Sequence, residues 1–259
     1  MDAIVTAGGV PEPGEPLYEY TQGTHKAMLD VAGKPMIQWV LDALCEAQKI
    51  RQIVMIGLSE DSGLKCKKLG AFLPNQGSML NNIRAGVGKI LELQPDAEHV
   101  MIVSSDVPSI KPEMIDWIVD TCMQTDDDIY YNVITQDVME KRFPLSKRSY
   151  TNLKDVAVCG GDINVIRSSL VTSEDEIWDH LIGARKNVLK QAAILGFDTL
   201  FLLLLRRITI DNAVKKVAKR LNVTGRAVIC PYAEVGMDID KPHQLELLRK
   251  DLAGVVKTS

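Results

Sequence analysis

The chain has 259 residues, enough for one large domain or two small ones, with the hydrophobic fraction (46%) and charged fraction (25%) of an ordinary globular protein. This apolar content excludes intrinsic disorder. The formal net charge of −4 argues against a dedicated DNA- or RNA-binding protein, and the aromatic content of 5% argues against a stacking surface for bases. We therefore expect no nucleic-acid partner.

The cysteines favour a reducing compartment. Their number is odd and none forms a Cys-x-x-Cys pair, so neither a disulfide framework nor a zinc site is expected. No signal peptide is visible at the N-terminus. The longest apolar run, 200–205, is well short of the roughly 20 residues that span a bilayer. We expect a cytoplasmic protein without stable membrane insertion.

Short apolar runs alternate with amphipathic segments over the first 135 residues. Buried strands are predicted at 3–5, 53–56, 100–103 and 129–135. Helices are predicted from Pro35, from Ser78 as N-cap through Leu91, and from Pro112 to about Thr125. This order predicts a three-layer α/β/α fold around a doubly wound, mostly parallel sheet. Such sheets bind ligands at the carboxyl ends of their strands, where Ala7-Gly8-Gly9 and Ser105-Asp106 would lie.

The second half of the chain is less regular. Residues 174–221 read as consecutive helices, the last with Asp211 as its N-cap, inside a mainly helical insert at about 170–225. A strand at 227–230 and a helix from Pro242 follow, and without internal repeats the chain reads as one domain over 1–259. The apolar segment of the insert, 194–205, is expected to be buried, with a homodimer interface or a membrane-surface contact as alternatives.

Ala7-Gly8-Gly9 alone is a weak signal for a phosphate-binding loop. Three further motifs accompany it: His25-Lys26-Ala27-Met28-Leu29 with Gly33-Lys34-Pro35-Met36-Ile37, Ser105-Asp106-Val107-Pro108, and Asp238-Ile239-Asp240-Lys241-Pro242. In this order they resemble the motifs of the nucleotidyltransferases with a GT-A-like fold. That group includes molybdenum cofactor guanylyltransferases, N-acetylglucosamine-1-phosphate uridyltransferases and CMP-Kdo synthetases. The resemblance spans residues 3–245.

The resemblance implies transfer of a nucleoside monophosphate from a nucleoside triphosphate (NTP) to a phosphorylated small-molecule acceptor, with release of pyrophosphate. The acceptor would be a sugar phosphate or a similar phosphorylated alcohol, or else a molybdopterin-type cofactor. Its ionised oxygen attacks the α-phosphorus in line, so no side-chain base is needed. Lys26, Asp106 and Asp240 would be the catalytic residues. Asp106 and Asp240 would hold Mg²⁺ or Mn²⁺, with Asp238 as an alternative ligand or outer partner.

The resemblance also implies binding residues. The nucleotide would contact Ala7, Gly8, Gly9, Lys26, Gln76, Gly77, Ser78 and Asp106. Gln76 and Ser78 would read a base edge, although Ser78 equally suits a helix N-cap. The acceptor would contact Gly161, Asp162 and basic residues among Arg142, Lys147, Arg148, Lys186 and Lys190. A solvated helical face is the alternative for the basic residues.

The first loop departs from the family pattern. Residues 9–16 contain no arginine, which commonly meets the triphosphate in the family, and they carry two glutamates; His25 also replaces the usual proline. We interpret this loop as a lid. Two alternatives stay open: a nucleotide-sugar-dependent glycosyltransferase, with Asp238-x-Asp240 as its motif, and a catalytically silent nucleotide-binding regulatory subunit.

Overall fold

The computed structural model describes residues 1–172, 199, 202 and 205–254. Among these residues, a nine-stranded sheet runs in the order β5-β4-β1-β6-β10-β7-β9-β8, and β11 also pairs with β7. The strands are β1 (Asp2–Thr6), β4 (Ile53–Ile56), β5 (Leu69–Leu73), β6 (His99–Ser104), β7 (Ile129–Thr135), β8 (Thr151–Asn152), β9 (Ala157–Gly160), β10 (Ile163–Arg167) and β11 (Gly225–Ile229). A separate small sheet joins β2 (Asp30–Val31) and β3 (Lys34–Pro35).

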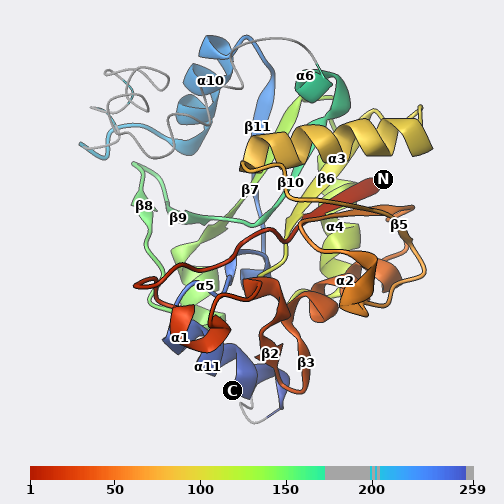
Figure 1. Cartoon of the computed structure of the whole chain (residues 1–259). Coiled ribbons are helices and arrows are strands. Elements are labelled where there is room, and N and C mark those ends of the chain that lie inside the picture. Colours follow the sequence, from red (N-terminus) through yellow and green to blue (C-terminus); the bar gives the residue numbers. More distant parts are fainter. Residues whose placement is uncertain (173–198, 200–201, 203–204, 255–259) are drawn as a thin grey trace.

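Helices cover both faces of the sheet (Figure 1). One face packs against α2 (Met36–Glu46), α4 (Pro112–Cys122), α5 (Gln136–Arg142) and α11 (Pro242–Leu252). The other carries α3 (Met79–Leu93), α6 (Ser168–Thr172) and α10 (Ile210–Arg220). Alternation along β1 explains the two cores, because Ala3 and Val5 enter one and Ile4 enters the other. The predicted three-layer α/β fold is confirmed.

The remaining described elements are short. They are α1 (Tyr18–Thr21) and the 3₁₀ turns η1 (Lys26–Met28), η2 (Glu60–Ser62) and η3 (Ala233–Gly236). The four predicted strands of the first half are all present, whereas β5 and the two-residue strands β2 and β3 were missed. β1, β4, β5 and β6 run parallel, so their carboxyl ends meet at one edge of the sheet.

Local signals placed several helix ends correctly. Ser78 is the N-cap of α3, where its Oγ accepts from the backbone N–H of Asn81 at 3.1 Å. The prediction for α10 was wrong: its N-cap is Thr209, whose Oγ1 accepts from the N–H of Asn212 at 3.4 Å. Asp211 lies in the first helical turn instead, where a carboxylate still favours the helix dipole.

A bulge interrupts the antiparallel partner of β7. Val133 pairs with Gly160 in β9, and Tyr130 pairs with Val165 in β10. From Tyr130 to Val133, β7 advances three residues, while the antiparallel segment from Gly160 to Val165 advances five. Gly161 and Asp162 lie in this longer segment. A Cβ at Gly161 would lie only 3.0 Å from the carbonyl oxygen of Asn132, so glycine suits this crowded position. Such a bulge redirects a side chain, here that of Asp162.

Much of the predicted helical insert lies outside the described residues. Its described part comprises 170–172, 199, 202 and 205–225, and Leu205 is exposed there. For the undescribed positions of 194–205, the expected burial or dimer contact stays a prediction. In the described parts of the chain, every helix is too short or too polar to cross a bilayer.

Candidate functional site

The loops after β1, β4 and β6 meet at the carboxyl edge of the sheet. The N–H of Ala7 donates to the carbonyl oxygen of Ile56 at 2.7 Å, and the N–H of Ser105 donates to that of Thr6 at 3.2 Å. Gly57 has a φ of +100°, and a Cβ there would lie 2.5 Å from the Cα of Gly8. The first loop and the loop after β4 therefore cross with backbone against backbone, a contact that only glycine permits.

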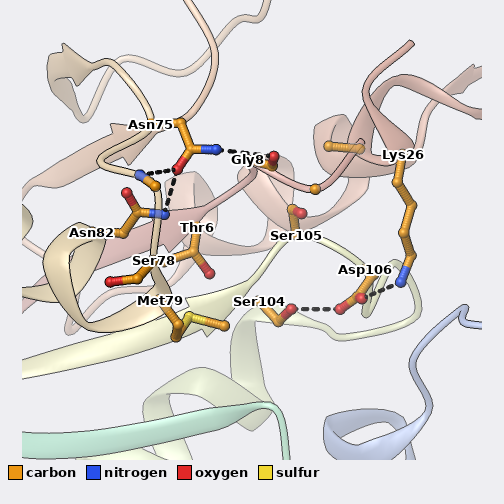
Figure 2. Close-up of a pocket in the computed structure, with 13 residues that line it drawn as sticks. Thr6, Gly8, Lys26, Asn75, Ser78, Met79, Asn82, Ser104, Ser105 and Asp106 are labelled. Atoms are coloured by element: carbon orange, nitrogen blue, oxygen red, sulfur yellow. Dashed lines mark hydrogen bonds and ion pairs between the residues drawn. The ribbon is translucent and has the colours of Figure 1, made fainter. Parts of the chain in front are cut away.

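A cavity of about 290 Å³ opens at this edge. It is lined by Thr6, Gly8, Gly9, Lys26, Ala27, Asn75, Gly77, Ser78, Met79, Asn82, Ser104, Ser105 and Asp106. Figure 2 shows its two ends: Asn75 reaches over Gly8 at one, and Lys26 points to Asp106 at the other.

The first end is built from neutral amides, and we call Gly8, Asn75 and Asn82 the amide end. The Oδ1 of Asn75 accepts from the Nδ2 of Asn82 at 3.1 Å and from the N–H of Gly77 at 3.0 Å. The Nδ2 of Asn75 donates to the carbonyl oxygen of Gly8 at 3.3 Å. The N–H of Gln76 donates to the Oδ1 of Asn82 at 2.7 Å. These bonds tie the loop before α3 to the first loop and fix the shape of the pocket.

At the other end, Asp106 lines the cavity and further carboxylates lie behind it; we call Asp106, Asp162, Asp238 and Asp240 the acidic end. The ammonium of Lys26 bridges two of them, at 2.7 Å from Asp106 Oδ2 and 2.6 Å from Asp240 Oδ1. The Oγ of Ser104 donates to Asp106 Oδ1 at 2.5 Å. Burial lowers the pKa of the Lys26 ammonium, but the two carboxylates outweigh burial and hold that pKa above its usual value.

The segment that carries Asp238 and Asp240 is held by three hydrogen bonds of its backbone. The N–H of Ile239 donates to the carbonyl oxygen of Asp106 at 3.0 Å. The Oε1 of Gln244, in the first turn of α11, accepts from the N–H of Asp240 at 2.9 Å and of Lys241 at 2.8 Å. These bonds fix Asp240 beside Asp106 although 134 positions separate them in the sequence (240 − 106).

The deeper carboxylates of the acidic end face an arginine. Arg148 forms an ion pair with the buried Asp238. The Oδ2 of Asp162 is buried and has no hydrogen-bond partner among the described residues. Burial raises the pKa of the Asp162 carboxyl to about 7; the charge of Asp106 adds to this effect and Arg148 opposes it.

A second cavity, of about 500 Å³, adjoins the first at Gly9 and Lys26. It is lined by Gly9, Val10, Pro11, Glu15, Pro16, Leu17, Lys26, Asp240 and Lys241. The first loop forms one wall and is anchored by the buried side chains of Pro11 and Leu17. The Oε2 of Glu15 accepts from the N–H of Glu12 at 2.8 Å, which holds this carboxylate in the loop.

Most of the predicted nucleotide-binding residues line the first cavity. They are Gly8, Gly9, Lys26, Gly77, Ser78 and Asp106. Two, Ala7 and Gln76, are not among its lining residues. The side chain of Ala7 is buried in the core, and the Nε2 of Gln76 donates to the carbonyl oxygen of Pro74 at 2.7 Å. The carboxamides near Gly8 belong to Asn75 and Asn82 instead.

Some of the residues predicted to bind the acceptor lie at the acidic end, and others do not. Arg148 and Asp162 lie at the acidic end, and Gly161 lies in the bulge beside them. Lys147 is exposed, and its φ of +50° turns the chain just before Arg148. Lys186 and Lys190 lie outside the described residues.

The prediction for Arg142 was wrong. Its guanidinium lies 2.8 Å from the Oε1 of Glu234 and 2.7 Å from the Oδ2 of Asp251. Both carboxylates are buried, and they belong to η3 and α11. Arg142 thus joins three elements of the fold and is paired with two carboxylates, whereas Arg148 forms its ion pair with Asp238.

The polar lining residues that sequence reasoning did not predict include Asn75, Asn82 and Lys241. Asn75 stands next to the predicted Gln76, and Lys241 follows the predicted Asp240 directly. Asn82 lies in the first turn of α3, one turn after the predicted Ser78.

Residues 3–199 match the family model of the MobA-like NTP transferase domain. A probable molybdenum cofactor guanylyltransferase of Thermococcus sibiricus is 27% identical over 99 residues, 38% of this chain and 48% of that protein. A 3-deoxy-manno-octulosonate cytidylyltransferase of Marinobacter nauticus is 32% identical over 113 residues, 41% of each chain. The chain thus spans half or less of the length of these curated relatives.

Solved structures agree on the fold. A hypothetical transferase from Thermus thermophilus superposes with a TM-score of 0.82 at 28% identity, covering 94% of this chain and 98% of that one. A CMP:2-keto-3-deoxy-manno-octonic acid synthetase complexed with CTP gives a TM-score of 0.58 at 14% identity, with 99% of each chain covered. The second likeness concerns the fold alone.

Proposed function

The chain belongs to the MobA-like NTP transferase domain family, and we propose that it transfers a nucleoside monophosphate from an NTP to a phosphorylated small-molecule acceptor, releasing pyrophosphate. One observation carries the proposal: Lys26 is held between Asp106 and Asp240 where the two cavities adjoin. A reacting phosphate at this point would have one cavity for the nucleoside and another for the rest of the substrate.

The acidic end fits a divalent cation. Carboxylate oxygens of Asp106, Asp238 and Asp240 lie within 4.8 Å of one another, and oxygen-only ligand sets suit Mg²⁺ or Mn²⁺. The ammonium of Lys26 already occupies a position between Asp106 and Asp240, so their oxygens converge on a positive charge. Asp106 and Asp240 would hold the cation, while Asp238 pairs with Arg148. When bound, the cation would neutralise charge on the phosphate oxygens.

The chain's own residues would bind and orient both substrates. The amide end would hold the nucleoside part, and Lys26 would contact phosphate oxygens near the α-phosphorus. Arg148 would meet the anionic group of the acceptor, and Asp162 would accept a hydrogen bond from one of its hydroxyl groups. These contacts favour a sugar phosphate or a similar phosphorylated polyol as the acceptor.

The reaction needs no protein base. An oxygen of the acceptor phosphate forms a bond to the α-phosphorus, and the bond from the α-phosphorus to the bridging oxygen breaks. The electron pair leaves with pyrophosphate. Because the attacking oxygen is already ionised, the work of the protein is to position two anions and to balance their charge.

Pyrophosphate release tests the proposal. Each of the four NTPs is combined with a panel of sugar phosphates and polyol phosphates in the presence of Mg²⁺, and Asp106→Ala serves as the inactive control. We expect release with one pairing and none from the variant. Nucleotide binding without release in any pairing would favour the silent regulatory subunit, and release of a nucleoside diphosphate from a nucleotide sugar would favour the glycosyltransferase. A cytoplasmic location and a homodimer stay predictions.

A further inference from the structure

The two cavities differ in the charges that line them. In the first, the acidic Asp106 faces the cationic Lys26. The second carries Glu15, Asp240, Lys26 and Lys241. Among the described residues that line either cavity, Lys26 and Lys241 are therefore the cations. The first loop, which forms a wall of the second cavity, contributes only the negative charge of Glu15.

Of these two cations of the described chain, Lys241 is the one whose ammonium is free to bind a ligand. Lys26 already serves two carboxylates, at 2.7 and 2.6 Å. The side chain of Lys241 is exposed, and its ammonium has no ion pair within the described residues. Its backbone is fixed, because its N–H donates to the Oε1 of Gln244 at 2.8 Å. The residue is thus anchored next to Asp240 with a long, mobile cationic side chain.

The first cavity is small for a whole nucleoside triphosphate. Its volume of about 290 Å³ lies at the low end of the roughly 300–1,000 Å³ of ligand pockets, and the amide end already shapes part of it. Continuation of a bound nucleotide past Lys26 leads into the second cavity, since Lys26 and Gly9 line both. The acceptor has its own candidate contacts at Arg148 and Asp162, neither of which lines the second cavity.

We propose that Lys241 is a pyrophosphate-binding residue that contacts the β- and γ-phosphates in the second cavity, in place of the arginine that the first loop lacks. The inference rests on the proposed nucleotidyl transfer. As the bond from the α-phosphorus to the bridging oxygen breaks, negative charge accumulates on the departing pyrophosphate. A lysine ammonium that follows this group stabilises both bound triphosphate and leaving group.

Glu15 opposes the charge of Lys241 in the same cavity. Its carboxylate accepts from the N–H of Glu12, which holds it in the loop that lines the cavity. A fixed negative charge beside a polyanion weakens binding of that anion and favours its departure. The pair of opposite charges would therefore balance capture of the triphosphate against release of the product.

The experiment compares four variants of the full chain. Lys241→Gln removes the charge, Lys241→Arg keeps it, and Glu15→Gln removes the opposing one. Lys250→Gln, on the last turn of the same helix, is the matched control for loss of a lysine charge. For each, the affinities for NTP and for the corresponding nucleoside monophosphate are measured by calorimetry, and pyrophosphate inhibition is measured in the forward reaction.

We expect Lys241→Gln to weaken NTP affinity and pyrophosphate inhibition by about tenfold, with monophosphate affinity unchanged. Lys241→Arg should stay within about threefold of the wild type, and Glu15→Gln should tighten pyrophosphate inhibition by a similar factor. Lys250→Gln should change none of these values. Thermal melting of each variant checks that the fold is retained.

Three results would overturn the inference. The first is that Lys241→Gln leaves NTP affinity intact. The second is that it weakens NTP affinity and monophosphate affinity equally. The third is that it raises only the KM for the acceptor. These results concern a protein that binds and transfers nucleotide, so they leave the proposed function standing. A wild-type chain that binds no NTP would instead remove the proposed function together with the inference that rests on it.

Discussion

The two ends of the first cavity are built on different principles. At the amide end, the described bonds between Gly8, Asn75 and Asn82 pair neutral donors with neutral acceptors. At the acidic end, four carboxylates face two cations, and the Oδ2 of Asp162 lacks a partner among the residues described. The first end is complete as it stands, whereas the second has an excess of negative charge.

This difference separates the shape of a site from its chemistry. A neutral, internally bonded pocket is ready for a ligand and gains little from ions. A cluster of carboxylates is costly until a cation or a ligand balances it. We therefore expect substitutions at the acidic end to act on turnover and on pH dependence, and those at the amide end to act on nucleotide affinity.

The largest effect is expected at Asp106. Asp106→Asn keeps the size of the side chain but removes the charge opposite Lys26, so kcat/KM for nucleotidyl transfer should fall by about 10³-fold. Melting should occur at or above the wild-type temperature, because Lys26 keeps Asp240 and the carboxylate repulsion decreases. Activity within tenfold of the wild type would contradict the assignment of chemistry to the acidic end.

An ion-pair network whose residues belong to neither end sharpens the comparison. Arg142→Ala leaves Glu234 and Asp251 buried without a partner, so the free energy of unfolding should fall by about 3 kcal/mol. Chemical denaturation measures this loss, and turnover per folded molecule should be unchanged. Lys89→Ala, which breaks a surface pair with Glu92, is the control and should cost less than about 1 kcal/mol. Equal losses would contradict the structural role of Arg142.

The acidic end should also make stability depend on pH. The pKa of Asp162 is raised to about 7 in the folded chain, so between roughly pH 4 and 7 the folded state holds a proton that the unfolded state has lost. The favourable contribution is present below that range and is lost as the pH rises through 7.

Measured with a chelator present, the wild-type free energy of unfolding should therefore fall by about 2 kcal/mol from pH 5 to 8, relative to Asp162→Asn. The variant removes the titrating group and serves as the reference at both pH values. Parallel pH profiles for the two proteins would show that Asp162 does not titrate in this range.

The smallest effect is expected at the amide end. Asn75→Ala removes the bonds to Gly8, Gly77 and Asn82, so the KM for the NTP should rise roughly three- to tenfold with kcat nearly unchanged. Steady-state kinetics at saturating acceptor separate the two constants. A fall in kcat that exceeds the rise in KM would show that this end takes part in the chemistry.

The regular part of the fold could be predicted from the sequence because its signals are local. β1, β4, β6 and β7 are buried apolar runs, and two helix starts are marked locally, one by the capping hydroxyl of Ser78 and the other by the fixed φ of Pro112. The bulge at Gly161 and Asp162 was not predictable, since it depends on the register between β7 and its antiparallel partner. β5 was missed because its half-buried residues show neither a long apolar run nor clear alternation.

The order of the motifs along the chain was enough to predict which residues form the acidic part of the candidate site. Lys26, Asp106 and Asp240 meet as expected, although they come from three distant segments. Sequence reasoning from charge alone misplaced Arg142, because its partners lie 92 and 109 positions away and leave no local signal. At the amide end, sequence reasoning chose Gln76, whereas the structure places the neighbouring Asn75 against Gly8. The geometry of the loop decides which of the two side chains turns inward.

The backbone contact between Gly8 and Gly57 also limits how this chain can diverge. A side chain at Gly57 would collide with the first loop, whereas a Cβ at Gly9, the residue after Gly8, would meet nothing within 4 Å. We therefore expect that the exposed part of the first loop beyond Gly9 can be exchanged while the crossing is kept. A chimera with a foreign loop at this position would preserve the framework, so new substrate ranges can arise by loop replacement without rebuilding the sheet.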